Sequence, residues 1–377
     1  MLHKISGLRV NLGLATSALF LTGLAACGGG TTTSNSTTST TGAGTKDGIS
    51  LGGNVALTGA GASFPAPLYQ NWFIELNKVV PELQVNYQSV GSGAGVEQFT
   101  AETVDFGASD TGMKDEEIAK VKRGVILLPM TAGSIVLAYN LPGVSDLKLG
   151  RQTYADIARG KITKWNDAKI AADNPGVKLP DKPITFVHRS DGSGTTSVFT
   201  KHLGKVSPDF DKEVGHGKSV EWPKTGTFVG AKGNEGVTAQ IQQTEGSMGY
   251  IEYGYAKQNN LAFAALQNQA GKFIVPSDKT AAVSLGSAEM PADLRVSVTD
   301  PQGEGSYPIV TYTWILAYKN YPDAAKAKAM EVMIEYGLNE GQLVASTLGY
   351  VPLPKEVREK VAAAADAISP DYTIKLK

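Results

Sequence analysis

Residues 184–203 read ITFVHRSDGSGTTSVFTKHL, and they predict a strand, a loop and a helix in direct succession. The β-branched and aromatic run up to Val187 predicts the end of a strand, and the run from Val198 onward predicts the first turns of a helix. The loop between them is rich in Gly, Ser and Thr. At a helix N-terminus such a loop offers an anion backbone N–H groups, hydroxyl donors and the positive end of the helix dipole. A plain surface turn is the alternative, because Asp-Gly and Ser-Gly are common turn dipeptides.

The same order of strand, loop and helix occurs twice more, and this repetition favours an anion site over three unrelated turns. Residues 55–57 predict a strand that leads into the Gly- and Ser-bearing loop 58–67. Residues 83–87 predict another strand, which is followed by GSGAG at 91–95. Ligands of open α/β sheets bind beyond the carboxyl ends of the strands. We therefore expect one compact oxyanion to be surrounded by the hydroxyls of Ser63, Ser92, Ser193 and Thr195.

Three charged residues accompany these loops. Arg189 brings a forked cation that suits a tetrahedral oxyanion, and Asp191, two residues later, is placed to hold the fork. Asp110 follows the short predicted strand 104–109. On local grounds, Asp110 is expected to be a turn or N-cap residue ahead of a helix near 115–123.

Strands alternate with helices along the chain, which predicts an α/β fold with largely parallel sheets. The continuous apolar runs 125–129 and 134–140 are typical of strands buried in a parallel sheet. A β-prone stretch at 307–318 and helices at 325–336 and 355–367 complete the chain. Its length of 377 residues predicts two domains.

The first residues have the pattern of a targeting signal. Two basic residues precede the apolar stretch 12–24, and Leu24-Ala25-Ala26-Cys27 resembles the lipobox of bacterial lipoproteins. We therefore predict a signal peptide at 1–26, lipidation of Cys27, and a flexible Gly-, Ser- and Thr-rich tether that completes 27–50. The alternative is a signal peptide with an incidental Cys. Cys27 is the only Cys in the chain, so it has no internal disulfide partner.

Composition and charge exclude several classes of function. The formal net charge of −1 gives no basic excess for nucleic acid, so any anion site must be local. No His, Cys and Asp residues have metal-ligand spacing, and no G-x-G-x-x-G fingerprint occurs. Gly217-Lys218-Ser219 resembles the end of a P-loop, but that motif requires Gly where this chain has Lys212. We expect neither a metal nor another cofactor.

Five segments together resemble one protein family, the periplasmic phosphate-binding proteins of bacterial phosphate ABC transporters. They occur in the order that the family has, and the resemblance runs from about residue 55 to the C-terminus. The segments are LTGAGASFPAP at 57–67, VDFGASD at 104–110, KITKW at 161–165, RSDGSGT at 189–195 and GYIEY at 249–253.

This resemblance implies a fold. It predicts an α/β protein of the type II periplasmic-binding-protein class, with two lobes joined by two crossover strands and the ligand between them. The crossovers are expected near 130–137 and 307–313. One lobe then comprises 51–131 plus 310–377, and the other comprises 132–309.

The resemblance also implies site residues. Asp191 matches the acid that orients the Arg. By position in the matching motifs, phosphate contacts fall on Ser63, Phe64 through its N–H, Ser92, Asp110, Arg189, Ser193, Gly194 through its N–H, and Thr195. Family members often have Thr where this chain has Ser63, and the hydroxyl is kept. No residue is expected to be catalytic.

An acid in an anion site has a chemical use. Near neutral pH, phosphate keeps at least one proton and donates it to the Asp110 carboxylate. Sulfate has no proton to give, so its lone pairs meet the lone pairs of the carboxylate. Asp110 therefore both selects phosphate and rejects sulfate.

These observations predict a non-catalytic receptor, a monomer that hands inorganic phosphate to the permease subunits of an ABC importer. It is expected in the bacterial cell envelope, anchored by lipid on Cys27 and facing the periplasm or the cell exterior. Three alternatives stay open. A secreted phosphatase or hydrolase would use Ser193 as its nucleophile, although DGSGT lacks the leading Gly of G-x-S-x-G and no Asp-His-Ser arrangement is evident. A surface adhesin would keep only the fold, and a receptor for another oxyanion would keep the site, with Asp110 arguing against sulfate.

Overall fold

The computed structural model describes residues 49–377, so the predictions for the signal peptide, for Cys27 and for nearly all of the tether lie outside the described residues. The strands are β1 Val55–Gly61, β2 Leu83–Ser89, β3 Phe106–Ser109, β4 Val125–Asn140, β5 Lys148–Leu149, β6 Thr185–Arg189, β7 Thr227–Ala231, β8 Ser247–Glu252, β9 Ala262–Phe263, β10 Ala265–Gln267, β11 Phe273–Ile274 and β12 Val310–Tyr318. The helices are α1 Ala66–Val79, α2 Ser92–Thr100, α3 Asp115–Ile118, α4 Arg151–Ala158, α5 Ala168–Asp173, α6 Gly194–Val206, α7 Pro208–Glu213, α8 Gly233–Gln243, α9 Tyr253–Gln258, α10 Asp278–Leu285, α11 Ala324–Leu338, α12 Glu340–Leu348 and α13 Lys355–Ala365.

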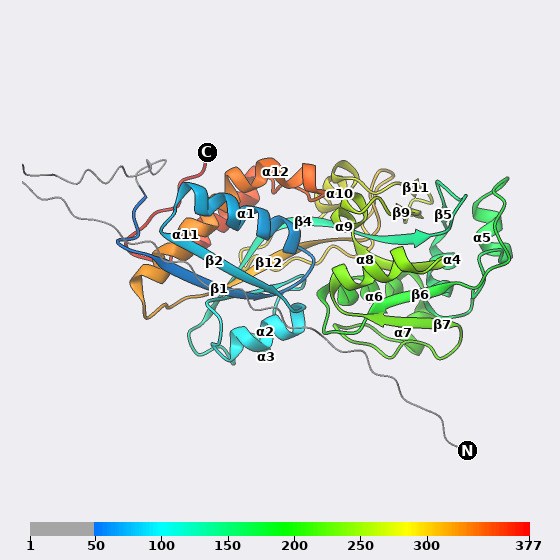
Figure 1. Ribbon diagram of the computed structural model, residues 1–377, viewed down its shortest axis with the longest axis horizontal. Coiled ribbons are helices and arrows are strands. Elements are labelled where there is room, and N and C mark those ends of the chain that lie inside the picture. The colour runs from blue at the N-terminus through cyan, green and yellow to red at the C-terminus, as the bar shows by residue number, and fades with distance from the viewer. Residues whose placement is uncertain (1–48) are drawn as a thin grey trace, which may run out of the picture. The chain divides into compact units, whose positions relative to one another are not determined.

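A nine-stranded sheet organises the described residues, in the order β2-β1-β3-β12-β4-β8-β6-β7, with β9 also paired to β4. β1 lies parallel to β2 and β3 at one end, and β6 lies parallel to β7 and β8 at the other. Figure 1 shows α1, α2 and α11 with the first group of strands and α4, α6, α7 and α8 with the second. Helices and strands therefore alternate around two separate groups of parallel strands, as the predicted α/β fold requires.

β4 and β12 connect the two halves of the sheet. The first part of β4, up to Ser134, pairs with β12, and the part from Ile135 to Asn140 pairs with β8. Figure 1 shows β4 running from one half to the other. The Ile135 N–H donates to the Ile309 carbonyl oxygen at 2.9 Å, just before β12 begins, so the two segments pass between the halves side by side. This confirms two lobes joined by two crossover strands. The limits of the lobes, with 51–131 and 310–377 in one and 132–309 in the other, stay a prediction.

Three local predictions are wrong. β4 is antiparallel to both β12 and β8, and not part of a parallel sheet as predicted. The prediction failed because a continuous apolar run indicates burial on both faces of a strand but not the direction of the strand. The runs 125–129 and 134–140 form one strand, whose register against β12 shifts between Thr313 and Trp314 beside Pro129. Of the turn and N-cap roles expected for Asp110, the N-cap role is wrong, since α3 begins only at Asp115, whereas residues 110 and 111 do form a bend.

The two ends of the described chain pack together. α1 buries Leu68, Tyr69, Trp72 and Leu76 along one face, a spacing of three and four residues that suits a helix packed on a core. The Trp72 indole N–H donates to the Gly341 carbonyl oxygen at 2.9 Å, which ties α1 to α12. Burial of this large ring is worth about 2–3 kcal/mol by area. The C-terminal helices therefore complete the same core as the first strands.

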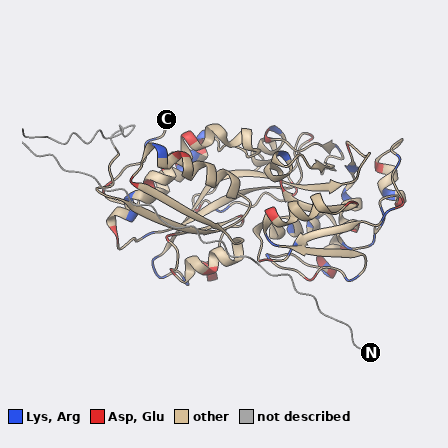
Figure 2. Ribbon diagram, in the orientation of Figure 1, with Lys and Arg blue, Asp and Glu red and all other residues tan. Residues whose placement is uncertain are grey.

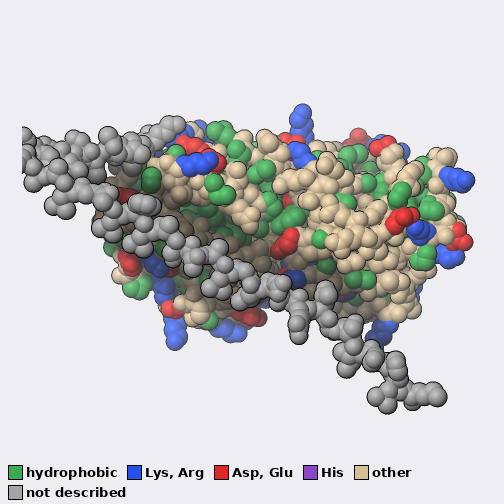
Figure 3. All heavy atoms as spheres, viewed as in Figure 1, with side chains coloured by type: hydrophobic (Ala, Val, Ile, Leu, Met, Phe, Trp, Pro, Cys, Tyr) green, Lys and Arg blue, Asp and Glu red, His purple; other side chains and the backbone are tan. Residues whose placement is uncertain are grey.

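Charge is spread evenly over the molecule. Figure 2 shows Lys and Arg mixed with Asp and Glu on both halves, and the face in Figure 3 likewise has no large region of one sign outside the parts covered by grey atoms. Within residues 49–377, no helix has both the length and the apolar content that crossing a bilayer requires. An anion that binds here must be attracted by local groups.

Candidate oxyanion-binding site

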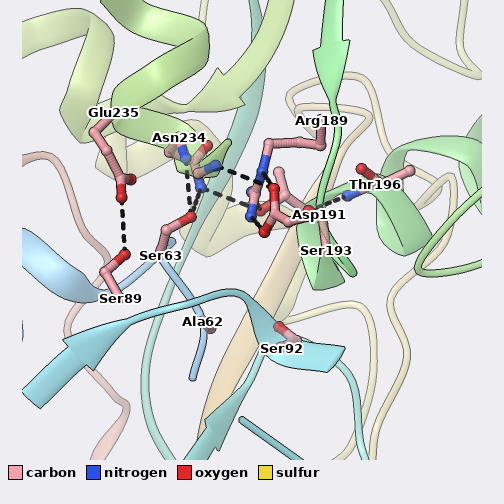
Figure 4. A network of polar contacts seen from close by, with 12 residues as sticks. Ala62, Ser63, Ser89, Ser92, Arg189, Asp191, Ser193, Thr196, Asn234 and Glu235 are labelled. Carbon is pink, nitrogen blue, oxygen red and sulfur yellow. Dashed lines mark hydrogen bonds and ion pairs between the residues drawn. The ribbon is translucent and has the colours of Figure 1, made fainter. Parts of the chain in front are cut away.

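Loops from both halves of the sheet meet at one place (Figure 4). The loops after β1, β2 and β3 come from one half, and the loops after β6 and β7 come from the other. Each follows the carboxyl end of a strand that has a parallel neighbour. α2, α6 and α8 begin at this place, so their backbone N–H groups and dipoles favour an anion there.

Three buried Ser hydroxyls accept hydrogen bonds from the protein. Ser63 Oγ accepts from both the backbone N and the side-chain Nδ2 of Asn234, each at 2.9 Å. Ser92 Oγ accepts from the Asp110 N–H at 3.2 Å. Ser193 Oγ caps α6 by accepting from an N–H of its first turn at 3.0 Å. Because these oxygens already accept, each hydroxyl has its proton left to donate to a ligand.

Three Tyr hydroxyls fix the loop between β1 and α1. They donate to three successive carbonyl oxygens: Tyr87 to Ala62 at 2.6 Å, Tyr255 to Ser63 at 2.7 Å and Tyr350 to Phe64 at 2.8 Å. These bonds hold each peptide plane in one orientation. Within residues 49–377 no acceptor contacts the Phe64 N–H, so this donor stays available to a ligand.

Asp110 is a buried carboxyl that contacts hydroxyls. Thr313 Oγ1 donates to its Oδ1 at 3.0 Å, and Thr195 Oγ1 donates to its Oδ2 at 3.1 Å. Burial raises its pKa to about 6, and the two Thr hydrogen bonds and the Arg189 charge oppose that rise. A carboxylate has about four lone-pair sites, so Asp110 has acceptor capacity left for a proton on a ligand.

Arg189 is held by Asp191. Its Nε and Nη2 donate to the two carboxylate oxygens at 2.7 and 2.5 Å, in a two-bond pairing. The Gly233 N–H donates to the same carboxylate at 3.1 Å. Burial alone would raise the pKa of Asp191, but its bonds to Arg189 hold the pKa below its ordinary value. Nη1 remains directed toward Thr195 Oγ1, at 3.5 Å, on the site side of the guanidinium.

Gly194 lets the two halves approach each other. A Cβ at this position would lie 2.5 Å from Ser92 Oγ, 2.7 Å from Asp110 Cβ and 2.9 Å from Asp110 Oδ2. All three distances are shorter than van der Waals contact, and the Cβ would lie where two site residues now pack. Only Gly fits at the first position of α6 in this arrangement.

The structure brings together the side chains or backbone of all the residues predicted to contact phosphate, with Asp191 behind Arg189. Their contacts with a ligand stay predictions. Asn234 was not predicted from the sequence. It is fully buried in the first turn of α8 and contacts both Ser63 and Thr195. A signal was present, because a fourth Gly-rich stretch, GAKGNEG at 230–236, spans the end of β7 and the start of α8. That stretch has no Ser or Thr.

The arrangement favours binding of a small tetrahedral oxyanion that carries a proton. Hydroxyl, amide and guanidinium donors surround one acceptor, Asp110. None of the described His residues hydrogen-bonds to Ser193: His188 and His202 contact the Arg189 carbonyl oxygen and Tyr154. Burial lowers the pKa of both rings. Among residues 49–377, no group of three or more His, Cys, Asp or Glu side chains lies together as a metal site would need.

A cleft of about 510 Å³ opens beside Asp110. Residues on both sides line it, including Thr311 and Trp314 from β12 and Ser197 from α6. Four groups that carry or can carry positive charge lie around it, namely Lys114, Lys201, His216 and Lys218. The cleft therefore reaches Asp110 past basic side chains, one of which, Lys218, pairs with the acid Glu117.

Fold and site together define a two-lobed binding protein with a buried site for a small oxyanion. A model of the PBP superfamily domain matches residues 31–334. The phosphate-binding protein PstS of Pasteurella multocida is 45% identical over 311 residues, which cover 81% of this chain and 89% of that protein. The PstS of Haemophilus influenzae is 45% identical over 306 residues, covering 80% of this chain and 90% of that protein.

Among solved structures, the phosphate-binding protein from Stenotrophomonas maltophilia aligns with a TM-score of 0.67 at 20% identity. The alignment covers 82% of this chain and 94% of that chain, and it supports the fold. The present chain belongs to the PstS family of phosphate-binding proteins within the periplasmic-binding-protein superfamily.

Proposed function

We propose that this chain captures inorganic phosphate between its two lobes and delivers it to the membrane permease of an ABC importer. The single observation that carries the proposal is the balance of the buried site, in which many donors face one acceptor, the Asp110 carboxylate. Phosphate near neutral pH needs many donors for its oxygens and one acceptor for its proton. The names of the PstS relatives support the same ligand.

The phosphate contacts that we propose are the eight residues expected from the sequence. Asn234 lies behind two of them, Ser63 and Thr195. Donors that are buried and already oriented favour the anion without a net positive protein. The lobes, proposed as 51–131 with 310–377 and as 132–309, close on the ligand. A contact that supports closure is the Gly93 N–H, which donates to the Gly192 carbonyl oxygen of the opposite loop at 2.8 Å.

The protein acts as a receptor and not as an enzyme. Ser193, the candidate nucleophile, uses its oxygen to cap α6 and has no His beside it among the described residues. We also propose a monomer, anchored in the cell envelope by lipid on Cys27 and facing the periplasm or the cell exterior. The lipobox pattern in the sequence supports that anchor.

Calorimetric titration of the protein, stripped of bound anion, with phosphate and with sulfate tests the proposal. We expect one phosphate to bind tightly and sulfate to give no heat. In Asp110→Asn the negative charge is lost and one of the two acceptor oxygens becomes an NH2 donor, so phosphate affinity should fall by about a hundredfold and sulfate should begin to bind. Absence of phosphate binding by the unaltered protein would refute the proposed function.

A further inference from the structure

Asn234 has one possible side-chain orientation. The Glu252 backbone N–H donates to Asn234 Oδ1 at 2.9 Å, so the oxygen must face that donor. Nδ2 then faces the opposite way, toward Ser63 Oγ at 2.9 Å and Thr195 Oγ1 at 3.3 Å. An amide whose oxygen is fixed in this way cannot exchange its donor and acceptor ends without leaving the Glu252 N–H unpaired.

Both lone pairs of the Ser63 hydroxyl are occupied as a result. One accepts from the Asn234 backbone N–H and the other from its Nδ2, each at 2.9 Å. A hydroxyl has two lone pairs and one proton. The remaining direction around the oxygen belongs to the proton, and within residues 49–377 no acceptor takes it. The Ser63 proton therefore has to be donated to something that the protein does not itself supply.

We propose that Asn234 is a positioning residue that fixes Ser63 as an obligate hydrogen-bond donor to bound phosphate. This inference rests on the proposed function. Ser63 lies in the loop after β1, and Asn234 lies at the start of α8 on the other half of the sheet (Figure 4). Asn234 therefore orients the Ser63 hydroxyl only when the two halves are closed. The hydroxyl becomes a fixed donor at the same moment that the ligand is enclosed.

Neighbouring hydroxyls provide an internal control. Ser92 is buried like Ser63 and also accepts from a backbone N–H, but its partner is Asp110 and it has no contact with Asn234. Removing Asn234 should therefore weaken the donation by Ser63 and leave the donation by Ser92 unchanged. A purely structural role for Asn234 would affect both serines equally.

A double-mutant cycle on phosphate affinity tests this proposal in the full chain. Ser63→Ala alone should lower affinity by about ten- to a hundredfold, the range for a hydrogen bond to a charged group. In an Asn234→Ala background the same change should lower affinity by a factor at least about threefold smaller, because Nδ2 is lost and only the backbone N–H of residue 234 still holds the hydroxyl. Ser92→Ala should cost the same factor in both backgrounds. Asn234→Leu, which restores side-chain volume without a donor, repeats the cycle if the Ala variant unfolds.

The outcomes separate the two proposals. If the unaltered protein does not bind phosphate, the proposed function fails. If the unaltered protein binds phosphate, and Ser63→Ala lowers the affinity by the same factor with and without Asn234, only the positioning role of Asn234 is overturned. Stopped-flow measurements add a second readout. Because the contact forms on closure, Asn234→Ala should raise the dissociation rate constant, and a loss confined to the association rate constant would contradict the proposal.

Discussion

The inner and the outer contacts between the two halves differ in chemistry. The inner contacts are Ser63 to Asn234 at 2.9 Å and Thr195 to Asp110 at 3.1 Å. The rim contact is Lys218 to Glu117 at 3.4 Å. Inside, the halves are joined by hydroxyls, an amide and the Asp110 carboxylate, all of them buried. At the rim they are joined by an ion pair whose side chains are 25% and 29% exposed.

The free-energy cost of burying a charge explains why polar contacts lie inside and an ion pair lies at the rim. A charge moved into a low-dielectric interior needs a partner or must change its protonation state, whereas a hydroxyl or amide needs only a hydrogen bond. Ion pairs at the rim are hydrated and screened, so each is worth about 1 kcal/mol or less. We expect the inner contacts to set affinity and specificity and the rim to set the rate of approach. Asp110 departs from this rule, since it is a buried acid without a direct cation partner.

The largest expected effect concerns Asp110 and pH. Burial raises its pKa from 3.8 to about 6, so between these values the folded, ligand-free protein binds more protons than the unfolded chain. Stability therefore falls as the pH rises through this window and is level above it. The rise is worth about 3 kcal/mol. The unfolding free energy of Asp110→Asn relative to the unaltered protein should increase by about 2–2.5 kcal/mol from pH 4 to pH 7, as measured by urea denaturation.

The comparison with Asp110→Asn is needed because other groups titrate in the same range. Burial lowers the pKa of His202 to about 4, which makes stability rise with pH in that window, opposite to Asp110. Burial raises the pKa of Glu331 to about 7, which acts in the same direction as Asp110. Both remain in the variant and cancel in the difference. If the unfolding free energies of the two proteins depended on pH in the same way, the pKa of Asp110 would not be raised, and this prediction would be wrong.

The next effect in size concerns the close approach at Gly194. A Cβ there would meet Ser92 Oγ at 2.5 Å and Asp110 Oδ2 at 2.9 Å, so Gly194→Ala should hold the halves apart. Strain of about 1–3 kcal/mol corresponds to a loss of about ten- to a hundredfold in phosphate affinity by calorimetry. The matched control is Gly236→Ala in α8, where the nearest atom would be 3.7 Å away. Equal losses in both variants would contradict the inner-contact model.

Local sequence patterns were enough to predict where the loops of the inner site lie. They could not predict contacts between residues that are far apart in the chain. The Gly, Ser and Thr residues at 58–67, 91–95 and 189–195 follow predicted strands directly, so their position at the sheet edge could be predicted. Arg189 and Asp191 are two residues apart, and their pairing was expected for that reason. The fold class followed from the alternation of strands and helices and from the family resemblance.

The remainder depends on residues far apart in sequence. Asn234 meets Ser63 across 171 positions, and Tyr350 reaches the Phe64 carbonyl oxygen across 286. No periodicity or spacing predicts such a pair. The antiparallel direction of β4 was also hidden, because its partner β12 enters the sheet only after residue 309. The burial that raises the pKa of Asp110 comes from the same long-range packing.

The smallest expected effect concerns the rim. Lys218 lines the 510 Å³ cleft beside Asp110 and pairs with Glu117 at 3.4 Å, with both side chains partly exposed. Lys218→Ala should lower the association rate constant for phosphate by about two- to fivefold at low salt, because steering by an exposed charge is a long-range effect. Raising the salt to about 0.5 M should remove the difference, since the screening length then falls to about 4 Å.

The rim lysine should change equilibrium affinity by less than about fivefold, in line with an exposed ion pair of at most about 1 kcal/mol. Lys78→Ala is the matched control: Lys78 also pairs with a Glu at a partly exposed position, but on α1 and outside the cleft residues. It should leave both rate constants unchanged. If Lys218→Ala instead weakened affinity as much as Gly194→Ala and did so equally at high salt, the rim would contribute to holding phosphate. The division between inner affinity and outer steering would then be wrong.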